Sequence, residues 1–107
     1  MIRMDVERQG QHLRITATGH ALHGQPGQDI VCAAASMLIQ AFIAWVQQQP
    51  ELCEGSNTVW FAGDAVIDLA VPLHMEALVR GAVDVVVTGF HLLEKKYPDN
   101  VTVGAKK

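Results

Sequence analysis

Residues 29–48 read DIVCAAASMLIQAFIAWVQQ, and this stretch constrains how the rest of the chain is arranged. Asp29 is a good N-cap residue, and the apolar run after it predicts a helix from residue 30 to about residue 48. Ser36 and Gln40 interrupt the run, which is slightly short for a membrane span, so we interpret it as a buried helix. Its apolar side chains fall on more than one side. A single sheet face therefore cannot cover them, and a neighbouring helix or a second subunit must do so.

The residues before this helix predict a β-hairpin. Apolar residues alternate with polar ones at positions 2, 4 and 6, and again at 13, 15 and 17. This period of two is typical of strands with one wet face, and residues 9–11 supply the turn. Residues 19–28 contain several glycines and a proline, which indicates a loop.

The residues after the helix predict a second hairpin and a second helix. Pro50 ends the first helix, and residues 51–56 form a loop. Residues 58–62 and 65–71 read as strands joined by a tight turn at Gly63 and Asp64. Residues 73–97 predict a helix, although a valine run and two glycines disfavour it. Residues 100–103 are a candidate last strand.

The element order is ββαββα with a candidate final β strand. Hairpins beside helices favour an α+β fold, a two-layer sandwich with a mostly antiparallel sheet and both helices on one face. The length of 107 residues fits a single domain spanning residues 1–107.

Composition excludes several classes of protein. Half of the residues are hydrophobic and 18% are charged, which is typical of a folded domain and not of a disordered tail. The net charge of −3 does not suit the chain to cover a phosphate backbone, so direct nucleic-acid binding is not expected. The N-terminus has charges and no apolar signal core, so we expect a cytoplasmic protein with reduced thiols.

The helix start carries the strongest chemical signal. Cys32 falls at the third position of the predicted helix, where unpaired backbone N–H groups and the helix dipole favour a thiolate. His20 precedes Cys32 in the loop at residues 19–28. The glycines of this loop would let the end of the second strand and the start of the helix become neighbours. An imidazole beside a thiol can take its proton and later protonate a leaving amine. Ser36 lies one turn further along the same face.

Each of these residues also has a purely structural interpretation. Cys32 could be a small core residue, His20 could bond within a turn, and Ser36 could serve helix packing. Asp29 could cap the helix without any catalytic role. Cys53 has no helix-start setting and is interpreted as a bystander.

The residues GHA at 19–21, Gly27, and DIVCAA at 29–34 followed by Ser36 resemble the signature of the bacterial ribosomal-processing cysteine protease family, Prp. The resemblance covers nearly the whole chain. It implies a cysteine endopeptidase that removes a short N-terminal extension from large-subunit ribosomal protein number twenty-seven during ribosome maturation. It also implies a homodimer. Catalytic roles would fall to Cys32 and His20, and supporting or substrate-binding roles to Asp29, Ser36, Gly19 and Gly27.

Two rival hypotheses remain at this level. The chain could be a non-catalytic module that binds ribosomal protein during ribosome assembly, with Cys32 only packed in the core. It could also be a metal-dependent hydrolase that uses His20, His23 and Cys32 as zinc ligands, although this spacing matches no common structural zinc pattern. The extra histidine His23 also leaves open which imidazole serves Cys32. The protease hypothesis requires neither a metal nor a cofactor.

Overall fold

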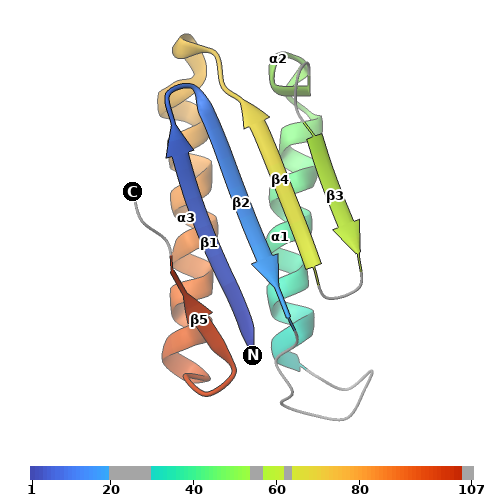
Figure 1. Cartoon of the computed structure of the whole chain (residues 1–107), viewed down its shortest axis with the longest axis vertical. Helices are drawn as coiled ribbons and strands as arrows, with labels where there is room; N and C mark the ends of the chain where they lie inside the picture. Colours follow the sequence, from blue (N-terminus) through green and yellow to red (C-terminus); the bar gives the residue numbers. More distant parts are fainter. Residues whose placement is uncertain (20–29, 54–56, 62–63, 105–107) are drawn as a thin grey trace.

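The computed structural model describes residues 1–19, 30–53, 57–61 and 64–104. Two long helices lie behind one face of a five-stranded sheet (Figure 1). The α+β class, the two-layer arrangement and the placement of both helices on one face are thereby confirmed. In chain order the elements are β1 (Ile2–Gln9), β2 (His12–Thr18), α1 (Ile30–Gln47), α2 (Pro50–Cys53), β3 (Asn57–Phe61), β4 (Asp64–Ala70), a 3₁₀ turn η1 (Leu73–Met75), α3 (Glu76–Lys96) and β5 (Val101–Val103).

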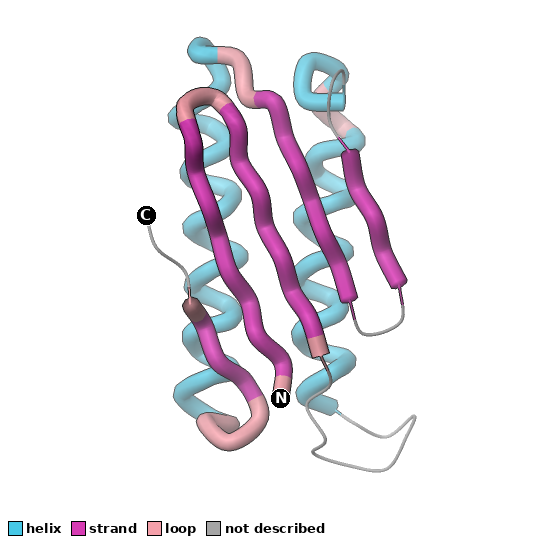
Figure 2. The backbone as a smooth tube through the Cα atoms, viewed as in Figure 1, coloured by secondary structure: helices cyan, strands magenta, loops and turns pink. Residues whose placement is uncertain are grey.

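The strands lie in the order β3-β4-β2-β1-β5. The strands lie side by side, with the helices behind them (Figure 2). Three of the four pairings are antiparallel, and only β5 runs parallel to its neighbour β1, as the arrows in Figure 1 show. The parallel pairing is possible because α3 carries the chain back along the sheet before β5 begins. The candidate last strand is thus a strand, and it completes one edge of the sheet.

The core forms between the inward sheet face and the two helices. Val6 lies opposite Ile15, and Ile15 lies opposite Ile67, so one row of apolar side chains crosses the central strands. Phe90 of α3 is fully buried against this layer. The other sheet face carries polar and charged side chains, as the alternation of the sequence predicts.

Helix α1 combines a core face with an accessible apolar face. Five of its side chains are buried: Val31, Ala35, Ile39, Phe42 and Val46. The length and composition of residues 30–47 would also suit a membrane span, and only 28% of this segment is buried. Packing on the sheet identifies it as a core helix. Its outer surface, with Ile30 and Met37 exposed, is not covered by the described part of the chain.

The described elements differ from the sequence prediction in two places. Residues 50–53 form the short helix α2, where a loop was expected. Pro50 starts this helix because its fixed φ angle suits the first helical position. Asp64, expected in a tight turn, is instead the first residue of β4.

Candidate active site

Cys32 is the third residue of α1, as predicted from the sequence. Its side chain is half-buried, carries a thiol and not a disulfide, and packs partly against the core. The neighbouring Val31 is fully buried and fixes this end of the helix on the sheet. Cys32 is therefore held in place by its helix and is still reachable from solvent.

The first turn of α1 offers the sulfur a favourable electrostatic setting. The first N–H groups of any α-helix lack partners within the helix, and the helix dipole adds partial positive charge there. This turn contains no acidic side chain that would oppose a negative sulfur. The same N–H groups can receive the oxyanion that forms when a carbonyl group is attacked.

Small residues surround Cys32 along the helix. Ala33 is exposed and Ala34 is half-buried. Ser36 lies one turn beyond Cys32 on the same face and is also half-buried. Small side chains leave the backbone of this face open to an approaching peptide, and the Ser36 hydroxyl can donate or accept a hydrogen bond.

Gly19 directly follows β2 and has a backbone conformation that requires glycine. Its φ is +92°, and a Cβ atom added there would collide with the carbonyl oxygen of Met1. Its N–H donates a hydrogen bond of 3.2 Å to Oδ1 of Asp64. Gly19 is thus fixed between the start of β1 and the start of β4.

His20, His23, Gly27 and Asp29 lie outside the described residues. Their described neighbours Gly19 and Ile30 bracket this segment, and the end of β2 and the first turn of α1 are found at the same end of the molecule (Figure 1). In the sequence, His20 directly follows Gly19, and Asp29 directly precedes Ile30. The pairing of His20 with Cys32 stays a prediction, and so does the role of Asp29.

The other three histidines, His12, His74 and His91, lie on the surface beside carboxylates. His74 Nε2 lies 2.6 Å from Glu51 Oε2, and both side chains are largely exposed. The described residues contain no cluster of histidine, cysteine, aspartate and glutamate that could hold a metal ion. The alternative zinc site of His20, His23 and Cys32 lies partly outside the described residues.

An ion-pair cluster on the outer sheet face holds β2 to β4. Arg14 Nε donates to Asp68 Oδ1 at 2.7 Å, and His12 Nε2 lies 3.3 Å from the same oxygen. The hydrogen bond from Arg14 is the main cause that lowers the pKa of Asp68, and burial opposes it. Two surface hollows near these residues are lined in part by Arg8 and His12, and neither lining contains a cysteine, serine or threonine. We therefore assign this cluster to stability and not to catalysis.

Sequence reasoning missed Asp64. The residue is separated from Gly19 by 45 positions, and its place after Gly63 is typical of a turn residue. Only the pairing of β2 with β4, in which Thr18 lies opposite Asp64, brings it to the end of β2. No local pattern in the sequence signals that contact.

Comparison with known proteins gives a consistent result. The sequence model of the family "Cysteine protease Prp" matches residues 1–102. The ribosomal processing cysteine protease Prp of Mycoplasma pneumoniae is 30% identical over 105 residues, which covers 95% of this chain and 92% of that protein.

Solved structures share the fold over nearly the whole chain. A crystal structure of the S. aureus protease Prp with a covalently linked product peptide has a TM-score of 0.81 at 22% identity and covers 99% of this chain and 100% of that one. The same S. aureus protease with a substrate peptide has a TM-score of 0.72 at 18% identity and the same coverage. A Streptococcus mutans protein has a TM-score of 0.70 at 23% identity, covering 98% of this chain and 93% of that one.

Proposed function

This chain belongs to the cysteine protease Prp family, and on that premise we propose that it removes an N-terminal extension from bacterial large-subunit ribosomal protein number twenty-seven. The observation that carries the proposal is the position of Cys32, half-buried in the first turn of α1. The name of the Mycoplasma pneumoniae relative supports a ribosomal substrate. The peptide complexes of the S. aureus protease support a peptide as the ligand.

The reaction starts with the Cys32 thiol giving its proton to His20. The sulfur then attacks the scissile carbonyl carbon, and the N–H groups of the first turn of α1 stabilise the oxyanion. His20 protonates the leaving amine as the C–N bond breaks, which leaves a thioester on Cys32. Water then attacks the thioester carbonyl carbon and gives one proton to His20. The C–S bond breaks, His20 returns that proton to the Cys32 sulfur, and the carboxylic acid product is released and ionises. Asp29 caps the helix and orients His20.

The substrate adds to the open edge of β3 in this proposal. In the described sheet, β3 and β5 are the edge strands. β3 runs toward the end of the molecule at which α1 begins (Figure 1). An extended peptide can join such an edge through main-chain hydrogen bonds and so reach the sulfur in a stretched conformation.

The protease acts as a homodimer in the cytoplasm in this proposal. Support for a dimer comes from the outer surface of the helix layer, where Met37 of α1 is 63% exposed and Val85 of α3 is 71% exposed. A second copy of the chain would cover such a surface, because exposed apolar patches commonly mark protein interfaces.

The decisive experiment uses the ribosomal protein from the same genome as substrate. Mass spectrometry of its N-terminus should find the shortened form after incubation with the wild-type chain. Cys32→Ala should lower the cleavage rate by more than about a thousandfold, because no other group replaces the nucleophile. Cys53→Ala, the matched control, should cleave at the wild-type rate.

Three outcomes would contradict the proposal. Cleavage that persists in Cys32→Ala would exclude the thiol mechanism. Cleavage lost on chelation, together with stoichiometric zinc in the purified protein, would favour the metal-dependent hydrolase. Slow alkylation of Cys32 at neutral pH, with no shortened product, would instead favour the non-catalytic binding module, because a packed thiol reacts slowly.

A further inference from the structure

Arg8 stands on the core side of β1, where the strand otherwise carries apolar residues. Ile2, Met4 and Val6 are the buried residues of this strand, and Arg8 continues their row at its end. It lies opposite the buried Leu13 of β2 and is itself half-buried. Within the described part of the chain, its guanidinium forms no ion pair with a carboxylate. A partly buried charge is most stable with a counter-charge beside it, so this position favours an external anion.

Arg8 lines a hollow between the β1–β2 turn and the start of α3. Arg80 of α3 lines the same hollow, and so does Val79, which is almost fully buried. The Val71 N–H donates a hydrogen bond of 2.8 Å to the Gln11 carbonyl oxygen and holds the turn against the end of β4. An apolar wall that excludes water strengthens the attraction between charges in such a hollow.

The charges that line the hollow leave one positive charge in excess. Two arginines, Arg8 and Arg80, and one glutamate, Glu76, contribute to the lining, with His12 counted as neutral. Glu76 Oε1 is bound to Arg80 Nη2 at 3.0 Å, and both side chains are more than half exposed. An ion pair this exposed contributes little to stability, so an incoming anion can replace the Glu76 carboxylate on Arg80.

We propose that this hollow binds a phosphate group between the guanidinium groups of Arg8 and Arg80. A tetrahedral phosphate can offer oxygens to two guanidinium groups on different sides, whereas a planar carboxylate matches one. The hollow, at about 180 Å³, is smaller than the roughly 300–1,000 Å³ of sites that enclose a whole drug-sized ligand. It therefore suits the phosphate group itself, either as inorganic phosphate or as the end of a phosphomonoester.

The phosphate site is separate from the candidate active site. The β1–β2 turn and the first turn of α1, which carries Cys32, lie at opposite ends of the molecule (Figure 1). Phosphate binding thus requires no protease activity, and its test stands apart from that of the proposed function.

Titration of the full chain with inorganic phosphate at neutral pH tests the site. The amide chemical shifts of Gly10 and Leu13, which line the hollow, should saturate with a Kd on the order of 1 mM. Sodium chloride of equal ionic strength is the blank, because it screens charge equally. Acetate, the carboxylate probe, should bind at least about tenfold more weakly. Methyl phosphate separates the two sources: equal affinity assigns the site to a phosphomonoester, and weaker binding assigns it to the free ion.

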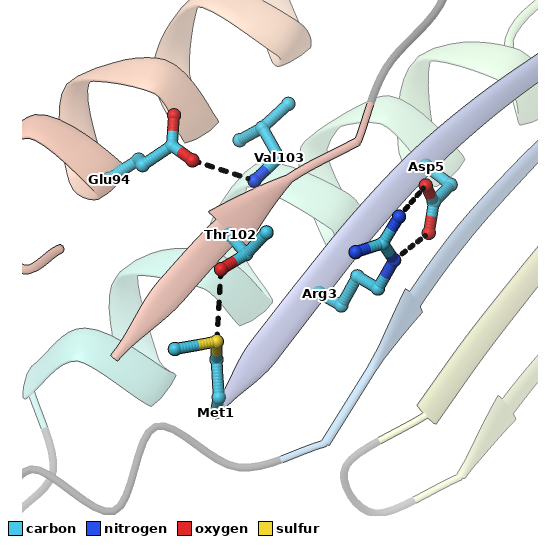
Figure 3. Close-up of polar contacts among 6 residues, drawn as sticks. All are labelled: Met1, Arg3, Asp5, Glu94, Thr102 and Val103. Carbon is cyan, nitrogen blue, oxygen red and sulfur yellow. Dashed lines mark hydrogen bonds and ion pairs between the residues drawn. The ribbon is translucent and has the colours of Figure 1, made fainter. Parts of the chain in front are cut away.

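Three arginine variants test the assignment to Arg8 and Arg80. Arg8→Gln and Arg80→Gln should each raise the phosphate Kd at least about tenfold, because each removes a charged donor. Arg80 is exposed, so Arg80→Gln keeps the test open if Arg8→Gln does not fold. Arg3→Gln is the matched control on β1, because Arg3 is exposed and bound to Asp5 through Nε at 2.9 Å (Figure 3). Its phosphate Kd should match the wild type.

Several results would overturn the inference. Gly10 and Leu13 shifts that follow the chloride blank up to about 50 mM phosphate would show that no specific site exists. A wild-type Kd in folded Arg8→Gln or in Arg80→Gln would remove that arginine from the site. An equal loss of affinity in Arg3→Gln would mean that phosphate responds to overall charge, and acetate binding as tight as phosphate would reject the tetrahedral anion.

Discussion

At the scale of single residues, Glu94 shows how one carboxylate joins two elements. Its Oε2 accepts a hydrogen bond of 3.0 Å from the Val103 N–H, which fastens β5 to α3 (Figure 3). This backbone hydrogen bond is the main cause that lowers the pKa of Glu94 below its ordinary value of 4.5. Burial opposes the shift, and His91, 3.4 Å away, adds to it. The ionised form of Glu94 is therefore the one that stabilises the fold.

The sign of this shift predicts a loss of stability in acid. A carboxylate whose pKa is lower in the folded state contributes stability above its unfolded pKa, and the contribution disappears as pH falls through the folded pKa. The contact of Glu94 with Val103 should therefore weaken below pH 4.5. The Val103 amide chemical shift should titrate in that range in the wild type.

Two variants test this assignment. Glu94→Gln keeps an oxygen acceptor but has no carboxylate to titrate, so the Val103 titration should disappear. Glu76→Gln, which replaces an exposed glutamate paired with Arg80 on the same helix, should retain it. A Val103 titration that survives in Glu94→Gln would show that another group is responsible.

The site itself was predictable only in part. A polar residue before an apolar run is a local signal, so the start of α1 and the third position of Cys32 followed from the sequence. The contact of Asp64 with Gly19 depends on which strands pair, and strand pairing cannot be predicted from any short segment of the sequence. The sequence therefore predicted the nucleophile and missed the residue that holds the neighbouring backbone.

At the scale of elements, α3 shows tertiary packing overriding local preference. Its valine run and two glycines disfavour a helix, yet residues Glu76–Lys96 are helical. Val79, Val83 and Phe90 are almost fully buried in the core, and they recur at helical spacing. The free energy gained by burying these side chains outweighs the low helix propensity of the valines and glycines. The helix was nevertheless predicted correctly, because the periodicity of the apolar residues counts for more than the propensity of single residues.

The two glycines of α3 give a matched stability test. Gly81 is exposed, and a Cβ atom added there meets nothing within 4 Å. Gly81→Ala should raise the free energy of unfolding by about 0.5–1 kcal/mol, because alanine has the better helix propensity. At Gly89 an added Cβ atom would lie 2.7 Å from Leu38 Cδ2, so Leu38 must move. Gly89→Ala should therefore gain less stability or lose some.

Urea denaturation of the two variants measures this difference. Both substitutions replace a glycine of α3 by alanine. The difference between their free energies of unfolding therefore reports the contact between α1 and α3. A gain in Gly89→Ala equal to that in Gly81→Ala would mean that the helices do not pack closely at Leu38.

At the scale of the whole molecule, the sheet order was not predictable from the sequence. Alternation and turn residues gave the hairpins, because their strands are close along the chain. The parallel pairing of β1 with β5 joins the two ends of the chain. That pairing depends on α3 carrying the chain back along the sheet, and no local pattern encodes it.

The helix layer has an outer apolar stripe that the whole molecule leaves accessible. On α3 the stripe consists of Leu78, Val85 and Leu92, which are 54–71% exposed and spaced seven residues apart. On α1 it includes Ile30 and Met37, at the same spacing. A seven-residue spacing keeps side chains on one side of a helix. Both helices therefore present apolar residues on the side away from the sheet, which is the surface expected to bind a second copy.

Charge placed on this stripe should separate the proposed dimer. Val85→Glu and Met37→Glu introduce charges at exposed positions, so each monomer should fold with a stability within about 0.5 kcal/mol of wild type. At a closed interface the same charges would be buried without partners, which is strongly unfavourable. Light scattering should give twice the chain mass of 11.6 kDa for the wild type and the single mass for both variants.

Ala70→Glu supplies the control, because Ala70 is exposed at the end of β4 and lies outside the helix stripe. The charge added by Ala70→Glu should leave the dimer intact. A lower mass by light scattering in Val85→Glu or Met37→Glu would then reflect where the charge lies on the surface and not the added charge alone. A wild-type chain of single mass at tens of micromolar would reject the dimer, since interfaces of standard size usually persist at such concentrations. Cleavage by that monomer would then show that one copy holds the complete site.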